Sequence, residues 1–223
     1  CYRFLSFFIL FLIKMTNDNY TGITTGTIAT ACSLAALDTI LGTSDIACVE
    51  VETPKNTLDI LIDKCESISD ESACAVAHKN PYNDPDVTVG LDIVSTVELF
   101  DKTDETSNVI ITGGEGVGLI TKPGLQIPVG DYAINPIPRQ MIIKNLSSKI
   151  PEGKVAKVTI SIPEGKNIAK KTMNPKLGII DGISILGTTG IARSMSSDAY
   201  KNSIVKQIDV AIASNIDNLV FVP

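Results

Sequence analysis

A glycine-rich segment near the middle of the chain is the first candidate for chemistry. Residues 111–130 read ITGGEGVGLITKPGLQIPVG, and five of the chain's sixteen glycines lie between Gly113 and Gly124. A phosphate cradle needs a strand, a glycine turn and then a helix whose first amides face the anion. Here VIIT precedes the glycines, but Lys122-Pro123-Gly124 excludes a following helix. The segment predicts strand, tight turn and strand, either as a plain hairpin or with bare backbone close to a bulky ligand.

Three other segments combine residue types that bind or react. Asp84 and Asp86 in DPDVT are close enough for metal binding or proton transfer, although Asp-Pro is also an ordinary turn. The loop INPIPR joins Asn135 to Arg139 before an expected helix, and a stiff loop around a guanidinium suits carboxylate binding. ISILGTTG places glycines and hydroxyls after a strand, where open α/β sheets bind ligands. The lone His78 is read as structural or exposed in preference to catalytic.

The charge is acidic overall but unevenly distributed. A net charge of −6, a pI near 4.8, no Trp and only 5% aromatic residues argue against a nucleic-acid partner. Between Lys122 and Lys176, however, ten basic residues face three acidic ones. This stretch is either a solvated basic face or a surface that meets a small polyanionic ligand.

The cysteines and the amino terminus bear on the compartment. Five dispersed cysteines and one histidine offer no zinc spacing and fit reduced thiols in the cytoplasm. Residues 4–13 are apolar but too few to span a bilayer, and Asn17 and Asp18 follow where small cleavage-site residues should lie. We expect residues 1–14 to be an over-extended gene start before Met15; if present, they would allow a weak membrane association, but no stable one.

The remaining sequence alternates between strand and helix patterns. Two domains are expected: an N-terminal α+β domain at 15–175 with a mixed, mostly antiparallel sheet, and the start of a truncated, doubly wound α/β domain at 176–223. Helices are expected at 24–41, 138–146 and 196–214, a hairpin at 47–64, strands at 72–79, 89–99, 108–112, 154–162, 182–186 and 218–222, and a short helix or turn at 167–172.

Taken together and in order, these segments resemble the CbiD family over residues 20–223. The motifs are TTGT at 24–27, NDPDVTVG at 83–90, GGEGVGLITKPGLQIPVGDYAINPIPR at 113–139, ISIPEG at 160–165 and AKKTMNPKLGIIDGISILGTTGIARSMS at 169–196. Three features depart from the family: Ile28 replaces a Cys, KNPYN at 79–83 replaces Lys-Asp-Ala-Gly-Asp, and the chain stops before family members do. We therefore expect a fragment that lacks the C-terminal part.

The resemblance implies a cytoplasmic C-methyltransferase of anaerobic cobalamin biosynthesis. It would transfer a methyl group from S-adenosylmethionine to C-1 of cobalt-precorrin-5B, giving cobalt-precorrin-6A, with cobalt present only within the tetrapyrrole substrate and no metal site of its own. The implied catalytic candidates are Asp84, Asp86 and Glu115. The residues expected to bind the substrate are Gly113, Gly114, Gly116, Gly118, Lys122, Asn135, Arg139, Lys170 and Lys171, with Arg193 as a further candidate. The residues expected to bind S-adenosylmethionine are Thr25, Gly26, Thr27, Gly187, Thr188, Thr189 and Gly190.

Two other functions stay open. A truncated chain could bind tetrapyrrole without turnover. A nucleotide-using α/β enzyme would exploit the glycine loops, but the chain has no GKS or GKT phosphate loop and no helix expected after GGEGVG. The sequence also leaves a homo-oligomer open.

Overall fold

A five-stranded sheet forms the base of the molecule. The computed structural model describes residues 21–82, 84–103, 107–193, 197–216 and 218–220. The sheet has the order β4 (Lys64–Ser69), β5 (Ser72–His78), β6 (Asp92–Asp101), β10 (Lys154–Ser161) and β7 (Val109–Gly113). Its pairs are antiparallel except for β7 and β10, so the predicted mixed, mostly antiparallel sheet is confirmed.

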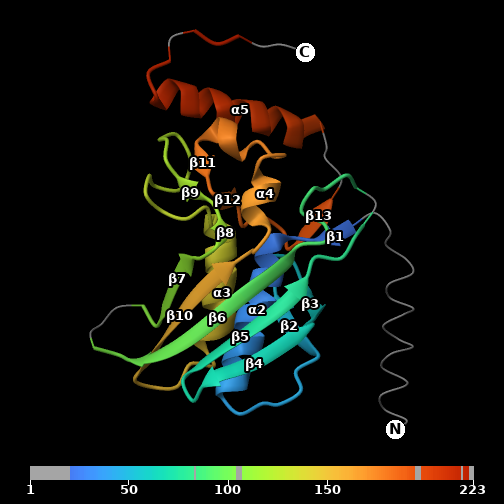
Figure 1. The fold of residues 1–223 in the computed structure, drawn as a ribbon, viewed down its shortest axis with the longest axis vertical. Coiled ribbons are helices and arrows are strands. Elements are labelled where there is room, and N and C mark those ends of the chain that lie inside the picture. Colours follow the sequence, from blue (N-terminus) through green and yellow to red (C-terminus); the bar gives the residue numbers. More distant parts are fainter. Residues whose placement is uncertain (1–20, 83, 104–106, 194–196, 217, 221–223) are drawn as a thin grey trace.

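Two helices cover one face of this sheet (Figure 1). The helix α2 (Thr25–Ile40) lies against β5 and β6 and against α3 (Pro136–Ser147), and the hairpin of β2 (Cys48–Glu52) and β3 (Thr57–Leu61) packs beside it. Because α2 has neighbours on several sides, it is buried from Thr25 to Leu37. We call the five-stranded sheet with α2, α3 and this hairpin the sheet body.

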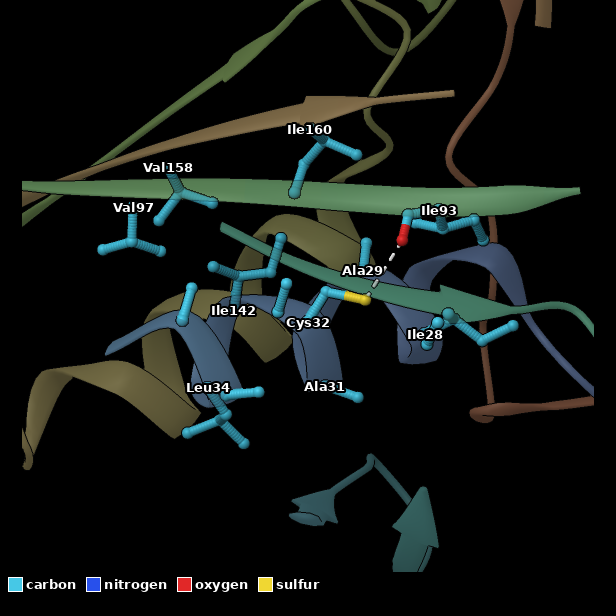
Figure 2. Close-up of a cluster of buried hydrophobic side chains, with 14 of the residues drawn as sticks. Ile28, Ala29, Ala31, Cys32, Leu34, Ile93, Val97, Ile142, Val158 and Ile160 are labelled. Carbon is cyan, nitrogen blue, oxygen red and sulfur yellow. Dashed lines mark hydrogen bonds between the residues drawn. The ribbon is translucent and has the colours of Figure 1, made fainter. Parts of the chain in front are cut away.

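The core of the sheet body is aliphatic and closely packed. Figure 2 shows Ile28, Ala29 and Leu34 of α2 beside Ile93 of β6 and Ile160 of β10, all of them buried. Alternation along β6 places Ile93, Ser95, Val97 and Leu99 inward. The thiol of Cys32 donates a hydrogen bond to the carbonyl of Ile93 at 3.2 Å, and burial raises the pKa of this thiol.

The one parallel crossover of the sheet body runs β7, α3, β10. We predicted such a unit at the C-terminal end instead, with strands at 182–186 and 218–222 around the last helix. That prediction is wrong where the structure can be read: Asn218, Leu219 and Val220 form no strand, and residues 221–223 lie outside the described part. The helix itself is present as α5 (Ser197–Ala213).

A second region, built from very short elements, lies between the sheet body and α5 (Figure 1). The strand β8 (Gly116–Val117) pairs in parallel with β12 (Gly182–Ile183), and β9 (Leu119–Ile120) pairs antiparallel with β11 (Ile179–Ile180). The helices α4 (Gly165–Ala169) and η1 (Asn174–Leu177) lie beside them, and β1 (Thr21–Ile23) pairs with β13 (Ile191–Arg193). Strands on both sides of the predicted boundary at residue 175 therefore pair with one another.

The predicted hairpin at GGEGVG is wrong in its pairing. The amide of Val117 donates to the carbonyl of Gly114 at 3.2 Å, so a turn does form. The two strands then diverge, because β7 stays in the main sheet beside β10 whereas β8 leaves it to pair with β12. The glycine segment thus carries the chain from the sheet body into the second region.

Candidate functional site

The glycines of GGEGVG are enclosed by other parts of the chain. Gly116 has a φ of 72°, and a Cβ there would overlap the carbonyl of Ile162. Gly118 lies against Ile179 and the carbonyl of Gly182, and Gly113 lies against the ring of Tyr132. The bare backbone therefore serves a close approach of chain to chain, whereas we had expected an approach to a flat ligand. Gly114, half-buried beside Ser161, is also crowded, and substrate contact by these glycines stays a prediction.

The two motifs expected to bind S-adenosylmethionine come together at the start of α2. The amide of Gly26 donates to the carbonyl of Leu186 at 2.8 Å, and the hydroxyl of Thr27 donates to the carbonyl of Gly190 at 2.9 Å. The hydroxyl of Thr25 accepts a hydrogen bond from the amide of Leu186 at 2.9 Å. These buried polar groups therefore hold the 186–190 loop onto α2.

Within that loop, the side chains differ in their surroundings. A Cβ at Gly187 would overlap the side chain of Thr24, and the hydroxyl of Thr189 donates to the carbonyl of Ile191 at 3.1 Å. Thr188 is exposed. Of the threonines predicted to bind the cofactor, Thr188 is thus the exposed one.

Next to this loop the second region contains a partly open cavity of about 560 Å³. Apolar side chains from β9, β11, β12 and the 124–127 loop form much of its wall, and α5 lies along one side. Its lining residues are Thr88, Ile120, Gly124, Leu125, Gln126, Ile127, Asn135, Thr172, Met173, Asn174, Leu177, Ile179, Ile183, Ser184, Leu186, Asn202, Ser203, Lys206 and Asp209. We call this part of the molecule, with the short strands, α4, η1 and α5, the cavity region.

The polar groups of the cavity wall are of two kinds. Asn174 is engaged, since it donates to the carbonyl of Gly182 at 3.0 Å and accepts from the Ser184 hydroxyl at 3.3 Å. Asn135 precedes α3, but its side chain makes no capping hydrogen bond. Lys206 and Asp209 lie one turn apart on α5, and neither side chain forms an ion pair or hydrogen bond with another described residue. The wall therefore offers an amide, a cation and a carboxylate that the fold does not use.

The basic stretch between residues 122 and 176 divides into two sets. Four lysines of the sheet body form ion pairs: Lys144 with Glu52, Lys149 with Asp38, Lys154 with Glu71 and Asp101, and Lys157 with Glu98. In the cavity region, Lys166 pairs with Asp181. The other set has no ion pair within the described part of the chain and is exposed: Lys122, Lys170, Lys171 and Lys176.

The unpaired lysines border the cavity. Lys170 and Lys171 directly precede Thr172 and Met173 of the cavity wall, and Lys176 precedes Leu177. The methylene groups of Lys122 pack against Gly178. We call these four residues the rim lysines; three of them, Lys122, Lys170 and Lys171, were predicted substrate ligands.

Arg139 is placed differently from the rim lysines. Its Nε donates to the carbonyl of Ile134 at 2.9 Å, and its two terminal nitrogens donate to Ile111 at 3.2 Å and to Tyr132 at 3.5 Å. The guanidinium is thus occupied by backbone carbonyls of β7 and the 132–134 segment. This geometry argues for a positioning role, in place of the bidentate carboxylate contact that the INPIPR loop suggested.

A buried ion pair beside the cavity was missed. Lys79 is only 2% exposed, and its ammonium donates to Asp86 and, at 2.8 Å, to the hydroxyl of Thr88, which lines the cavity. Tyr82 also donates to Asp86, at 2.9 Å. Lys79 could have been recognised because it continues the inward alternation of Ala73, Ala75 and Ala77 in β5.

The surroundings of Asp86 keep it ionised. Burial alone would raise its pKa, but hydrogen bonds from Lys79 and Thr88 outweigh that cost and lower the pKa to about 2. Burial and the neighbouring Asp86 raise the pKa of the Tyr82 hydroxyl. Asp86 is therefore a satisfied structural carboxylate, which disfavours it as the proton-transfer group that we considered.

The other acidic candidates and the lone histidine are less constrained. Asp84 is half-buried and Glu115 is exposed, and neither carboxylate has a hydrogen bond to a described residue. His78 is exposed at the end of β5, with its Nδ1 2.8 Å from Asp92, and it is not part of the cavity wall. Arg193 is exposed at the end of β13.

The described ranges of the chain contain no group of three or more His, Cys, Asp or Glu side chains that could hold a metal ion. None of the helices in those ranges has the length and apolar character needed to cross a membrane.

Comparison with known proteins identifies relatives of this arrangement. The sequence profile of the CbiD family matches residues 13–194. The chain is 78% identical over 209 residues to a cobalt-precorrin-5B C(1)-methyltransferase of Methanobrevibacter smithii, covering 94% of this chain and 58% of that protein. It is 54% identical to the protein of the same name from Methanosphaera stadtmanae, covering 95% of this chain and 54% of that one.

A solved structure shares the fold. The crystal structure of a cobalamin biosynthesis protein (CbiD) from Archaeoglobus fulgidus superposes with a TM-score of 0.55 at 28% sequence identity, covering 84% of this chain and 58% of that one. The chain thus spans somewhat more than half the length of the relatives it matches. With the profile match extending over most of its residues, the chain belongs to the CbiD family.

Proposed function

We propose that this chain takes part in methylating C-1 of cobalt-precorrin-5B to give cobalt-precorrin-6A, with S-adenosylmethionine as the methyl donor. The names of its relatives support the reaction, and the unpaired rim lysines beside a ligand-sized cavity are the structural observation that supports it most. Cobalt enters as part of the substrate. Free thiols at Cys32, Cys48, Cys65 and Cys74 are compatible with a cytoplasmic enzyme.

The substrate's chemistry matches the rim. A cobalt-precorrin carries several acetate and propionate arms around a flat macrocycle, so its binding site needs several cations at separate positions. The rim lysines provide four ammonium groups that no described carboxylate neutralises. Flexible lysine side chains suit carboxylates on flexible arms, because the ammonium acts as a point charge without a fixed angle.

The reaction is a displacement at a methyl carbon. The ring carbon C-1 supplies the electron pair of the new carbon–carbon bond. The bond from the methyl carbon to sulfur breaks, its electron pair stays on sulfur, and S-adenosylhomocysteine leaves. Nothing covalent has to form on the enzyme, so holding the two ligands in line supplies most of the rate enhancement. Asp84 and Glu115 remain candidates for placing a carboxylate near the sulfonium.

The alternatives differ in what they predict for turnover. A tetrapyrrole-binding chain without catalysis would hold the substrate on the rim lysines and transfer no methyl group. A nucleotide-using enzyme loses support, because β7 leads through a turn into β8 and no helix starts at the glycines.

The test combines binding with methyl transfer. The chain is incubated with cobalt-precorrin-5B and methyl-labelled S-adenosylmethionine, and the product is identified by mass. The double variant Lys170→Glu, Lys171→Glu should bind the tetrapyrrole at least about tenfold more weakly, since two favourable charge contacts become repulsive. The matched control is Lys102→Glu, an exposed lysine at the far end of β6.

The outcomes separate the candidate functions. Label in a product with one added methyl group supports the methyltransferase. Tetrapyrrole binding that depends on the rim lysines, with no label transferred, supports the non-catalytic alternative. If Lys102→Glu weakens binding as much as the double variant, the rim lysines are not the substrate surface.

A further inference from the structure

The cavity and the rim are chemically different, and the proposed reaction has two different ligands. We infer that the cavity beneath α5 is the site of the methyl donor: Lys206 and Asp209 hold its amino-acid group, and the apolar wall with Asn135 holds its nucleoside. The tetrapyrrole then lies outside, on the rim lysines. This inference rests on the proposed methyltransferase function and assigns a place to each ligand.

Size favours the donor. Pockets for small molecules and cofactors typically measure about 300–1,000 Å³, and the cavity of about 560 Å³ lies within that range. S-adenosylmethionine is an elongated molecule of one nucleoside and one amino acid. A cobalt-precorrin, with its macrocycle and many arms, is far larger and is better accommodated by an open surface.

Charge points the same way. Lys206 and Asp209 are the charged side chains of the cavity wall, so the wall has one cation and one carboxylate. A polycarboxylate would meet a near-neutral wall there and would be repelled by Asp209. The α-carboxylate and α-ammonium of an amino acid, in contrast, match two opposite charges that lie one helical turn apart.

The rest of the wall suits a nucleoside. Ile120, Ile127, Ile179 and Ile183 are all buried at 8% exposure or less and present an aliphatic surface to a flat base. Asn135 brings an amide that is not used in capping α3, with both donors and an acceptor for a base edge or a ribose hydroxyl. Apolar walls with a few convergent polar groups are typical of sites for small molecules and cofactors, the class to which the methyl donor belongs.

The arrangement also orients the reaction. Because Lys170, Lys171 and Lys176 adjoin Thr172, Met173 and Leu177 of the cavity wall, a macrocycle held by the rim lysines lies next to a donor inside. The methyl group is then passed from the cavity to the rim, as an in-line displacement requires.

Binding measurements without turnover test the inference. Calorimetry with S-adenosylmethionine, S-adenosylhomocysteine and adenosine is performed on the chain and on Lys206→Met, Asp209→Asn and Asn135→Ala. The double variant Lys206→Met, Asp209→Asn should weaken S-adenosylmethionine and S-adenosylhomocysteine by about tenfold or more and leave adenosine, which lacks the amino-acid group, unchanged. Asn135→Ala should weaken all three.

Controls separate the site from the helix. Lys102→Met makes the same exchange far from the cavity, and Ile212→Ala alters α5 at a side chain that is 66% exposed and not part of the wall. Both should bind S-adenosylmethionine as the unaltered chain does. Circular dichroism checks that α5 stays folded; if the double variant unfolds, Asn135→Ala, just before α3, is the variant that tests the site.

Each result supports or overturns the inference. It is overturned if the unaltered chain does not bind S-adenosylmethionine, or if the cavity variants bind it as tightly as the unaltered chain does. It is also overturned if the cavity variants weaken tetrapyrrole binding and not S-adenosylmethionine binding. If donor binding follows the prediction but no methyl is transferred, the site stands and the proposed function fails. If methyl transfer proceeds equally in the cavity variants, the function stands and the site assignment fails.

Discussion

The sheet body and the cavity region are built on different principles. The sheet body has strands of five to ten residues and helices of twelve and sixteen, with an aliphatic core and ion-paired lysines on its surface. The cavity region has strands of two or three residues with closely packed glycines between them, unpaired lysines at its rim and a cavity in its wall. Figure 1 shows the two regions stacked, with α5 at the far end.

This difference distinguishes residues that the packing of the fold explains from residues that are available to bind a ligand. In the cavity region the glycines at first look like ligand contacts, but Gly116 and Gly118 are explained by neighbouring backbone. The side chains without partners, such as Lys171 on the rim and Lys206 in the wall, have no such explanation within the described fold. We therefore expect substitutions in the first group to lower stability and substitutions in the second to lower binding.

The largest effect is expected at the buried ion pair of Lys79 and Asp86, which lies between β5 and β6 and beside the cavity. Lys79→Met should lower the free energy of unfolding by about 3–5 kcal/mol, because Asp86 would keep its charge without the ammonium that stabilises it. Urea unfolding followed by circular dichroism measures this loss. The double variant Lys79→Met, Asp86→Asn should be less destabilised than the single one; a simple sum of two single losses would contradict a coupled pair.

A smaller effect is expected inside the cavity region at Gly116. Gly116→Ala should cost roughly 2–4 kcal/mol, from the left-handed φ of 72° and from the overlap with Ile162. The matched control is Gly153→Ala, where φ is 77° but no atom lies within 4 Å of the added Cβ. This control should cost roughly 1–2 kcal/mol, from backbone strain alone. If both variants lose the same stability in thermal unfolding, Gly116 is required only for its backbone conformation and not for the close approach of Ile162.

The smallest effects compare a paired lysine with an unpaired one. Lys149→Ala removes the ion pair with Asp38 at 2.7 Å and should cost about 0.2–1 kcal/mol of stability. Lys171→Ala removes a rim lysine and should change stability by less than about 0.5 kcal/mol while weakening tetrapyrrole binding. If Lys171→Ala destabilises the chain more than Lys149→Ala does, the distinction between the two sets of lysines is wrong.

The long elements of the sheet body were predictable from periodicity. Alternation identified β5, β6 and β10, and the threonines before α2 marked its start, where the hydroxyl of Thr24 accepts from the amide of Thr27. The edge strand β4 was missed, because most of its residues are exposed and polar and no alternation is visible.

Most of the cavity region could not be predicted from local sequence patterns. Strands of two residues have no period, and the pairing of β8 with β12 joins segments far apart in the sequence. The residues of α5 that line the cavity lie on the same amphipathic helix that we predicted, but only tertiary packing shows which side faces the hollow. The sequence showed that lysines gather in this stretch, but it did not show which of them form ion pairs.

The pairing of β1 with β13 has a consequence for how the molecule forms during synthesis. Thr21 lies opposite Arg193, so nearly the whole described chain lies between these partners. The last strand of the main sheet ends at Ser161, and a growing chain folds from its first-made part onward. We expect the sheet to be complete on the ribosome before β13 and α5 are synthesised, so that β1 pairs with β13, and the cavity that α5 lines takes shape, only afterwards.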